Sequence, residues 1–249
     1  MENISTVALS RLVAQTRDLD VIATNLANAD TPGFRAERTL FTAWFAPEPA
    51  GAEPPGGGPV AYAQDGATFR DTTPGALKVT GNPLDLAIGD AAGWFTVQTP
   101  RGPRLTRAGQ FQLDATGTVV TSQGYPLLDA NGQPLRTRPT DTRLKVTGDG
   151  TLSSENGPIG RIGVVTVADA STLVPEGGAL FSTSQPTAPD AAPRLVQGAV
   201  EGSNVQPVLE IARMMSQLRD FQLTAQMVQS EINRQTGAID KILHPTALG

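Results

Sequence analysis

The chain has 249 residues, a formal net charge of −5 and no cysteine. The absence of cysteine excludes disulfides, thiolate metal sites and cysteine nucleophiles, and an acidic chain without a basic block argues against nucleic-acid binding. The length allows one large domain or two modest ones. The first 30 residues lack an uninterrupted apolar segment, and no run of about 18 apolar residues occurs, so we expect neither a secretory signal peptide nor a membrane-spanning helix.

The N-terminal segment predicts a long amphipathic helix. Leu12, Leu19, Ile22 and Leu26 follow one another at spacings of 7, 3 and 4 residues, which places them on one helix face. The helix should begin near residues 3–5 and end near residue 28. The sequence DTPG at residues 30–33 stops it, because proline disfavours helix in the preceding residue and Pro-Gly fits the centre of a type II turn.

The C-terminal segment predicts a second amphipathic helix, which begins after Ser203-Asn204 with Pro207 in its first turn and ends before Pro245. Its apolar stripe consists of Ile211, Met215, Leu218, Ala225, Val228, Ile232, Ile239 and Ile242. Any helix buried in a globular domain shows such a stripe. A length of about 36 residues, however, exceeds the usual 10–14 and favours packing against neighbouring subunits. We expect the two helices to pack as a coiled-coil-like pair or in a larger array.

The middle of the chain predicts a loop followed by β structure. Residues 47–59 read PEPAGAEPPGGGP, which is too poor in apolar residues to form core. Short runs rich in Val, Thr, Leu and aromatic residues predict strands at Ala76–Thr80, Leu84–Ile88, Trp94–Thr99, Leu105–Arg107, Phe111–Leu113, Thr118–Thr121, Arg143–Thr147 and Ile159–Val167. Hairpin turns are predicted at Asn131-Gly132, Asp149-Gly150 and Asn156-Gly157. Antiparallel pairing is expected, because the spacing leaves no room for crossover helices.

The predicted fold is therefore mainly β with long terminal α-helices and an antiparallel β-rich middle domain. We expect an N-terminal helix and turn at 1–35, a Pro/Gly-rich connecting loop at 36–70, a β-rich domain at 71–195 and a C-terminal helix at 196–249.

No catalytic, cofactor or metal site is predicted. His244 is the one histidine and stands at the end of the last helix, where a cap or surface role explains it better than a catalytic one. Without cysteine or a second histidine, one chain cannot build a metal cluster or a histidine-based triad. Turn formation accounts better than catalysis for the aspartates Asp85, Asp90, Asp114 and Asp149.

Residues 25–35, NLANADTPGFR, closely resemble the signature of the bacterial flagellar axial proteins, the rod, hook and hook-associated family, which is approximately NLANxxTPGF. The matching residues are Asn25, Leu26, Ala27, Asn28, Thr31, Pro32, Gly33 and Phe34. Residues 81–128 resemble the central block of the same family, which includes GxPLDxAI and TRxGxF. Residues 201–215, EGSNVQPVLEIARMM, resemble its SNVxxVxEM segment.

The resemblance implies a non-enzymatic, structural subunit of the flagellar basal-body rod. Members of the family are exported unfolded through the flagellar type III channel without a cleaved signal peptide. They polymerise helically into a hollow shaft that transmits torque and conducts exported subunits, with the terminal helices as the inner wall and the β domain outside. The implied partners are other rod subunits and copies of the same chain, with adjacent ring and export components. No cofactor, nucleic acid or membrane insertion is implied.

Within the family, Val7–Leu26 is most similar to the proximal-rod subunits. The sequence departs from the family pattern at Asp90–Phe95 and at Leu105, so a distal rod, hook or junction subunit is the first alternative. A secreted β-domain protein that binds or hydrolyses carbohydrate is an alternative of another class.

Two groups of residues are predicted to serve assembly. The helix seam consists of Leu12, Leu19, Ile22, Ile211, Met215, Leu218, Val228, Ile232 and Ile239. Asn25 and Asn28 are poor residues for a helix because they compete for backbone hydrogen bonds, so we expect them to make specific contacts at the turn or with a neighbouring subunit. For Phe34, a local core anchor and an assembly contact both stay open.

Overall fold

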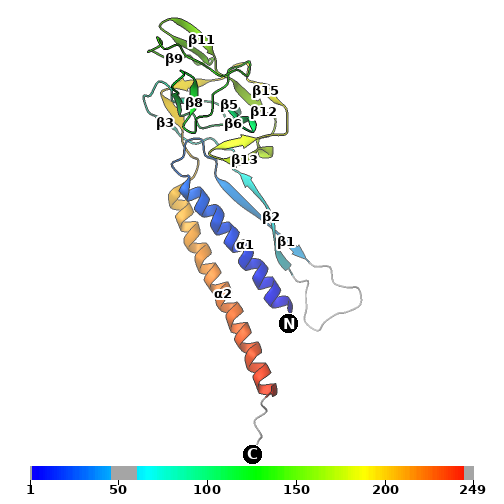
Figure 1. Ribbon diagram of the computed structural model, residues 1–249. Coiled ribbons are helices and arrows are strands. Elements are labelled where there is room, and N and C mark those ends of the chain that lie inside the picture. Colours follow the sequence, from blue (N-terminus) through cyan, green and yellow to red (C-terminus); the bar gives the residue numbers. More distant parts are fainter. Residues whose placement is uncertain (1, 46–60, 244–249) are drawn as a thin grey trace, which may run out of the picture. The chain divides into compact units, whose positions relative to one another are not determined.

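The computed structural model describes residues 2–45 and 61–243 and contains two compact units (Figure 1). The helical unit comprises Met1–Leu26, Glu37–Phe69 and Pro207–Gly249, and the β unit comprises Ala27–Ala36 and Arg70–Gln206. The Pro/Gly-rich run at 47–59 and His244 lie outside the described residues.

The helical unit contains α1 (Glu2–Ala27), the paired strands β1 (Glu37–Phe45) and β2 (Ala61–Arg70), and α2 (Pro207–Leu243). The prediction of a long helix at each end is confirmed, with 26 residues in α1 and 37 in α2. Figure 1 shows the two helices running in opposite directions. They meet where Gln217 donates from Nε2 to Asp18 Oδ2 at 2.7 Å.

The segment expected as a loop at 36–70 holds strand at both of its ends. β1 reads ERTLFTAWF and contains two threonines and three aromatic residues, which favour strands; β2 reads AYAQDGATFR and contains one threonine and two aromatic residues. The proline and glycine residues between them dominate the composition of the segment as a whole, which explains why its sequence reads as a loop.

The largest sheet of the β unit has six strands. In spatial order they are β13 (Val174–Gly177), β14 (Leu180–Ser182), β6 (Gly102–Thr106), β5 (Gly93–Thr99), β12 (Val164–Val167) and β15 (Thr187–Pro189). The hairpin of β5 and β6 sets Phe95 opposite Thr106 and Thr99 opposite Gly102. Phe95 and Val97 alternate along β5 and are both 0% exposed, so one face of this strand lies in the core.

Smaller sheets complete the β unit. A three-stranded sheet contains β11 (Gly157–Arg161), β10 (Thr151–Ser154) and β9 (Lys145–Val146). The two-stranded pairs are β16 (Leu195–Gln197) with β4 (Leu86–Ile88), β17 (Ala199–Glu201) with β3 (Leu77–Val79), and β7 (Phe111–Leu113) with β8 (Val119–Thr121). A short 3₁₀ helix, η1 (Ala170–Thr172), precedes β13. Each of these pairings in the described β unit is antiparallel.

The strand predicted at Ile159–Val167 is wrong as one element. The structure splits it into β11 and β12, which belong to different sheets. At the break, Gly163 donates from its N–H to Leu128 O at 2.9 Å, and a Cβ atom on Gly163 would lie 2.5 Å from Asp129 O. Glycine thus permits a close backbone approach that ends one strand before the next begins.

The start of the C-terminal segment also differs from the prediction. Residues 195–201 form β16 and β17, which pair with β4 and β3 from the beginning of the β unit. The helix itself begins at Pro207, as predicted, and proline suits this first position because the N–H that it lacks would have no partner within the helix.

The core of the β unit joins several sheets around the edge-to-face pair Phe95 and Phe111, whose ring centroids are 5.3 Å apart. A second cluster surrounds Trp94 and Phe181, whose centroids are 5.1 Å apart. Across the described part of the chain, neither helix has the length and apolar content needed to cross a membrane.

Candidate functional site

The turn at Thr31–Phe34 has the predicted type II form. Phe34 donates from its N–H to Thr31 O at 3.2 Å, and Gly33 has a φ of +69° at the third position. A Cβ atom on Gly33 would lie 2.3 Å from Ala108 N and 2.4 Å from Arg107 C. The position therefore requires glycine both for its backbone conformation and for the close approach of another segment.

Asn25 is 0% exposed and lies at the end of α1 in the helical unit. Its Oδ1 accepts from Glu37 N at 2.8 Å and its Nδ2 donates to Glu37 O at 2.8 Å. The amide thus satisfies both backbone groups of the first residue of β1, which explains an asparagine in a position that is otherwise poor for a helix.

Asn28 and Phe34 make local contacts on either side of the turn. Thr31 donates from Oγ1 to Asn28 Oδ1 at 3.2 Å. Phe34 is buried with Ala36 and Val205, and the Arg70 guanidinium lies 5.1 Å from its ring centroid. Of the remaining motif residues, Leu26 is half-buried and Ala27 is exposed.

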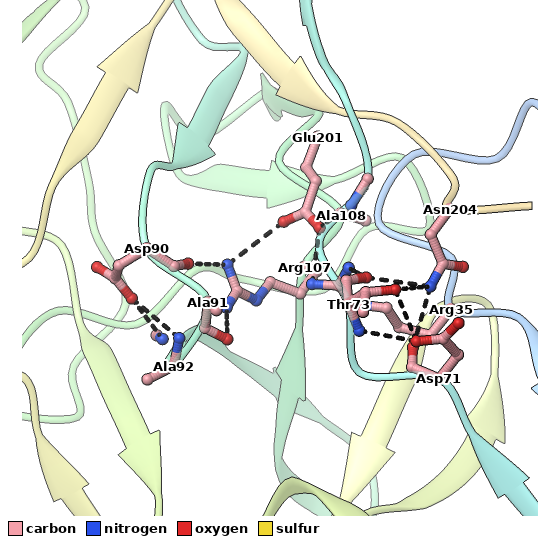
Figure 2. A network of polar contacts seen from close by, with 12 residues as sticks. Arg35, Asp71, Thr73, Asp90, Ala91, Ala92, Arg107, Ala108, Glu201 and Asn204 are labelled. Atoms are coloured by element: carbon pink, nitrogen blue, oxygen red, sulfur yellow. Dashed lines mark hydrogen bonds and ion pairs between the residues drawn. The ribbon is translucent and has the colours of Figure 1, made fainter.

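The residue after the turn motif, Arg35, joins a buried charged cluster (Figure 2). Its Nη2 lies 2.7 Å from Glu201 Oε1, and Arg107 Nη1 lies 3.3 Å from Glu201 Oε2. All three side chains are at most 2% exposed. We call these three residues the Arg–Glu–Arg cluster. The Glu201 carboxylate pairs with two buried guanidinium groups. Removing this carboxylate would leave both positive charges buried without a counter-ion.

Backbone carbonyls supply further acceptors to the two arginines. Arg107 donates from Nη1 to Asp90 O at 2.8 Å and from Nη2 to Ala91 O, and Arg35 donates from Nη1 to Thr73 O. Burial lowers the pKa of the Arg35 and Arg107 side chains, and the Glu201 carboxylate opposes that shift. Both groups remain cations at physiological pH because an arginine pKa starts so high.

The side chain of Asn204 forms hydrogen bonds that link its own segment to two other segments of the β unit. Its Oδ1 accepts from Ala36 N at 2.7 Å, and its Nδ2 donates to the carbonyl oxygens of Asp71 and Thr73, each at 3.0 Å. Glu201 adds two links, since its backbone O accepts from Gly33 N at 2.8 Å and its Oε1 accepts from Gly75 N at 3.0 Å. The turn motif and the SNV segment are therefore two halves of one junction.

The predicted seam residues fall into two groups. In α1, Ile22 is buried at 4% exposed, and Leu12 and Leu19 are half-buried. In α2, Val228 is half-buried. The exposed residues are Ile211 at 41%, Met215 at 55%, Leu218 at 44% and Ile232 at 48%. The side chain of Ile239 lies outside the described residues.

A different row of α2 is covered within the helical unit. Its buried or half-buried members alternate at spacings of 4 and 3 residues and are Glu210, Met214, Gln217, Phe221, Thr224, Val228, Glu231 and Gln235. Polar contacts contribute to this row: Glu210 Oε1 lies 2.6 Å from Arg38 Nη1, and Gln217 donates from Nε2 to Asp18 Oδ2 at 2.7 Å. α1, β1 and α2 together line a polar groove of about 380 Å³.

Sequence reasoning missed the charged cluster, the role of Asn204 and the polar members of the covered row. The segments that resemble the family contain Arg107, Glu201 and Asn204, and Arg35 directly follows the turn. Their position in or beside these segments is the one feature of the sequence that could have marked them as functional.

The aspartates predicted to form turns do so at Asp90, Asp114 and Asp149, whose carboxylates accept from backbone N–H groups two or three residues later. Among the described residues, no group of three His, Asp or Glu side chains is placed to hold a metal ion.

Three family descriptions match the chain. "Flagella basal body rod protein" matches residues 6–35, "Flagellar hook protein FlgE/F/G D1 domain" matches 87–167, and "Flagellar basal body rod FlgEFG protein C-terminal" matches 196–231. The first and third matches contain the two halves of the junction.

Similar proteins extend over nearly the whole chain. The flagellar basal-body rod protein FlgF of Caulobacter vibrioides is 35% identical over 97% of this chain and 98% of its own length. FlgF of Rhizobium meliloti is 36% identical over 95% of each chain. FlgG of Bacillus subtilis is 34% identical over 84% of this chain and 88% of its own.

Proposed function

The chain belongs to the family of flagellar basal-body rod proteins, and we propose that it occupies the proximal part of the rod as a FlgF-like subunit. It is a structural, non-enzymatic protein of the flagellar basal body. The proximal position is supported by relatives named FlgF that span nearly the full chain. The FlgG relative, at similar identity over a smaller share of this chain, makes a distal rod subunit the second candidate.

The observation that carries an assembly role is a pair of open apolar rows on α2. Ile211, Met215 and Leu218 each follow a member of the covered row by one residue. Leu209, Leu223 and Met227 each precede one, and they are 53%, 64% and 61% exposed. Since one residue turns a helix by about 100°, the open rows flank the covered row on its two sides.

This arrangement gives α2 three faces with separate tasks. The covered row pairs with α1 and β1 as an antiparallel, coiled-coil-like unit, and the open rows pack against helices of two neighbouring subunits. Burying apolar surface stabilises such contacts by about 25 cal/mol per Å², so a row of several large side chains stiffens the assembled shaft.

In this proposal the chain ends and the β unit have different places in the rod. The helices at the two ends of the chain contribute to the inner tube, and the β-rich region lies outside it. Copies of the chain and other rod subunits polymerise helically into a hollow drive shaft that conducts exported subunits. Subunits reach it unfolded through the flagellar type III channel without a cleaved signal peptide, and basal-body ring and export components are neighbours.

A charge on an open row tests the role of α2. We expect Met215→Asp to abolish incorporation into basal bodies while the β unit still folds, because a charge buried at an interface without a partner is costly. Gln226→Glu is the matched control, since Gln226 is an exposed polar residue of the same helix that neither directly precedes nor directly follows a member of the covered row. Purified basal bodies are probed for the chain, and motility is measured. Normal incorporation of Met215→Asp would contradict packing on this row.

A further inference from the structure

The Arg–Glu–Arg cluster lies where the two ends of the β unit meet. Arg35 follows the turn at Thr31–Phe34, and Glu201 is the last residue of β17 before the segment that leads to α2. Next to the cluster, Phe34 packs on Val205, and Asn204 donates from its N–H to Phe34 O at 3.4 Å. The entering and leaving segments of the β unit are therefore neighbours.

Apolar packing alone holds this junction weakly. The local hydrophobic cluster contains Phe34, Ala36 and Val205, with Ala29 packed against it. Apolar contacts of this size are also nondirectional, so they tolerate sliding of one segment along the other. Arginine differs, because its planar guanidinium demands acceptors at fixed directions.

The contacts of Glu201 are specific in direction. Its two carboxylate oxygens form ion pairs with different arginines, and its backbone O accepts from the N–H of Gly33 at the centre of the turn. Arg107 in turn belongs to the backbone that a Cβ atom on Gly33 would strike. A shift of the turn would separate a buried charge from its partner as well as break a hydrogen bond.

We propose that Glu201 is the positioning residue of the assembly motif: it holds Arg35 and Arg107 so that the turn at Thr31–Phe34 and the Ser203–Val205 segment keep one fixed spacing, which incorporation into the rod requires. This role rests on the proposed rod function. The charged cluster thus sets the distance between the turn and the Ser203–Val205 segment, and it does so in addition to any stabilisation of the fold.

The test compares two full-length variants of equal stability. Glu201→Gln removes the carboxylate charge and keeps the side-chain volume, and we expect it to lower the melting temperature by about 10 °C. Leu135→Ala removes a buried apolar side chain from the core of the same unit without touching any charge. Both are expressed in cells that lack the native chain, at a temperature where purified samples of both are fully folded.

We expect Glu201→Gln to be exported and to lose at least about 90% of its incorporation into basal bodies, while Leu135→Ala incorporates normally. Equal incorporation of the two variants would overturn the positioning role, because stability alone would then account for Glu201. Glu176→Gln is the charge control: Glu176 also faces two arginines, Arg101 at 3.1 Å and Arg104 at 2.9 Å, but Arg101 is 68% exposed. Loss of incorporation for this control would also overturn the proposal.

Should Glu201→Gln not fold, Glu201→Asp and Arg107→Lys replace it. Each keeps the charge and changes the reach or the direction of the contacts, so the proposal expects reduced incorporation of both folded variants, and normal incorporation would overturn it. The rod function is checked separately in cells without the chain. Complete rods there would contradict the rod function, whereas normal Glu201→Gln rods together with defective null rods would contradict only the positioning role.

Discussion

The side-chain amide of Asn25 pairs with both backbone polar groups of Glu37, accepting from its N and donating to its O, each at 2.8 Å. An amide can do this because it carries a donor and an acceptor side by side, as a neighbouring strand would. The last turns of α1 and the first residue of β1 are thereby held together within the helical unit.

Replacing Asn25 by aspartate should destabilise the helical unit. The carboxylate still accepts from Glu37 N, but it faces Glu37 O without a donor at a site that is 0% exposed. The expected cost is about 1–3 kcal/mol or more, which thermal unfolding followed by far-UV circular dichroism measures. Asn233→Asp is the control, because Asn233 is exposed and its Oδ1 accepts from Gln229 Nε2 at 3.1 Å, which a carboxylate does equally well. Equal losses in the two variants would contradict the paired role of Asn25.

Gly33→Ala should cost more than a positive φ alone explains. Gly124 has a φ of +83° with no atom within 4 Å of its Cβ position, so Gly124→Ala should cost only about 1–2 kcal/mol of backbone strain. At Gly33 the same strain is joined by collision with the backbone of Arg107 and Ala108, and we expect at least about 3 kcal/mol.

Denaturant unfolding of the two glycine variants measures the difference, and equal free energies would show that the neighbouring backbone yields easily. In cells we expect the larger substitution Gly33→Val to be exported without stable incorporation, because an unfolded chain needs no turn.

Acid should loosen the segment held by Glu155. Its carboxylate accepts from Thr142 N and Oγ1 and from Arg143 N, and these hydrogen bonds lower its pKa to about 2. A carboxylate with a lowered folded-state pKa stabilises the fold above its unfolded pKa of about 4.3 and loses that contribution as the pH falls towards 2.

The measurement for Glu155 is the change in unfolding free energy between about pH 5 and pH 2.5. Glu155→Gln should lower the free energy of unfolding at the higher pH and reduce the difference in that free energy between the two pH values. Asp114→Asn provides a comparison at another turn whose carboxylate pKa is also lowered, chiefly by the Thr116 hydroxyl. An unchanged pH response in Glu155→Gln would show that Thr142 and Arg143 are held by other contacts.

The elements that were predicted correctly are those whose structure is determined by residues close together in the sequence. The long helices follow from repeated 3- and 4-residue spacing, and the turn at Asp149-Gly150 connects β9 to β10 as expected. The turn at Thr31–Phe34 likewise follows from Pro-Gly alone. The turn predicted at Asn156-Gly157 is displaced by one residue: Ser154 pairs with Gly157, so Glu155 and Asn156 form the turn and Gly157 already belongs to β11.

The features that were missed depend on distant partners. β16 and β17 are three residues each, too short for a periodic pattern, and they become strands by pairing with β4 and β3. The covered row of α2 includes Gln217 and Thr224, which a search for apolar residues passes over. The ion pair between Glu201 and Arg35 could not be predicted, because these residues become neighbours only in the folded chain. The exposed rows of α2 remain a prediction about packing between subunits.

The pairing of β3 with β17 and of β4 with β16 has a consequence for the timing of folding. Among the described strands, β3 and β4 have no other ladder partner, and the partners they have are made near the end of the chain. Contacts so distant in sequence form late, because a long loop must close before they contribute. During synthesis, β3 and β4 therefore remain without their strand partners until residues 195–201 have been made.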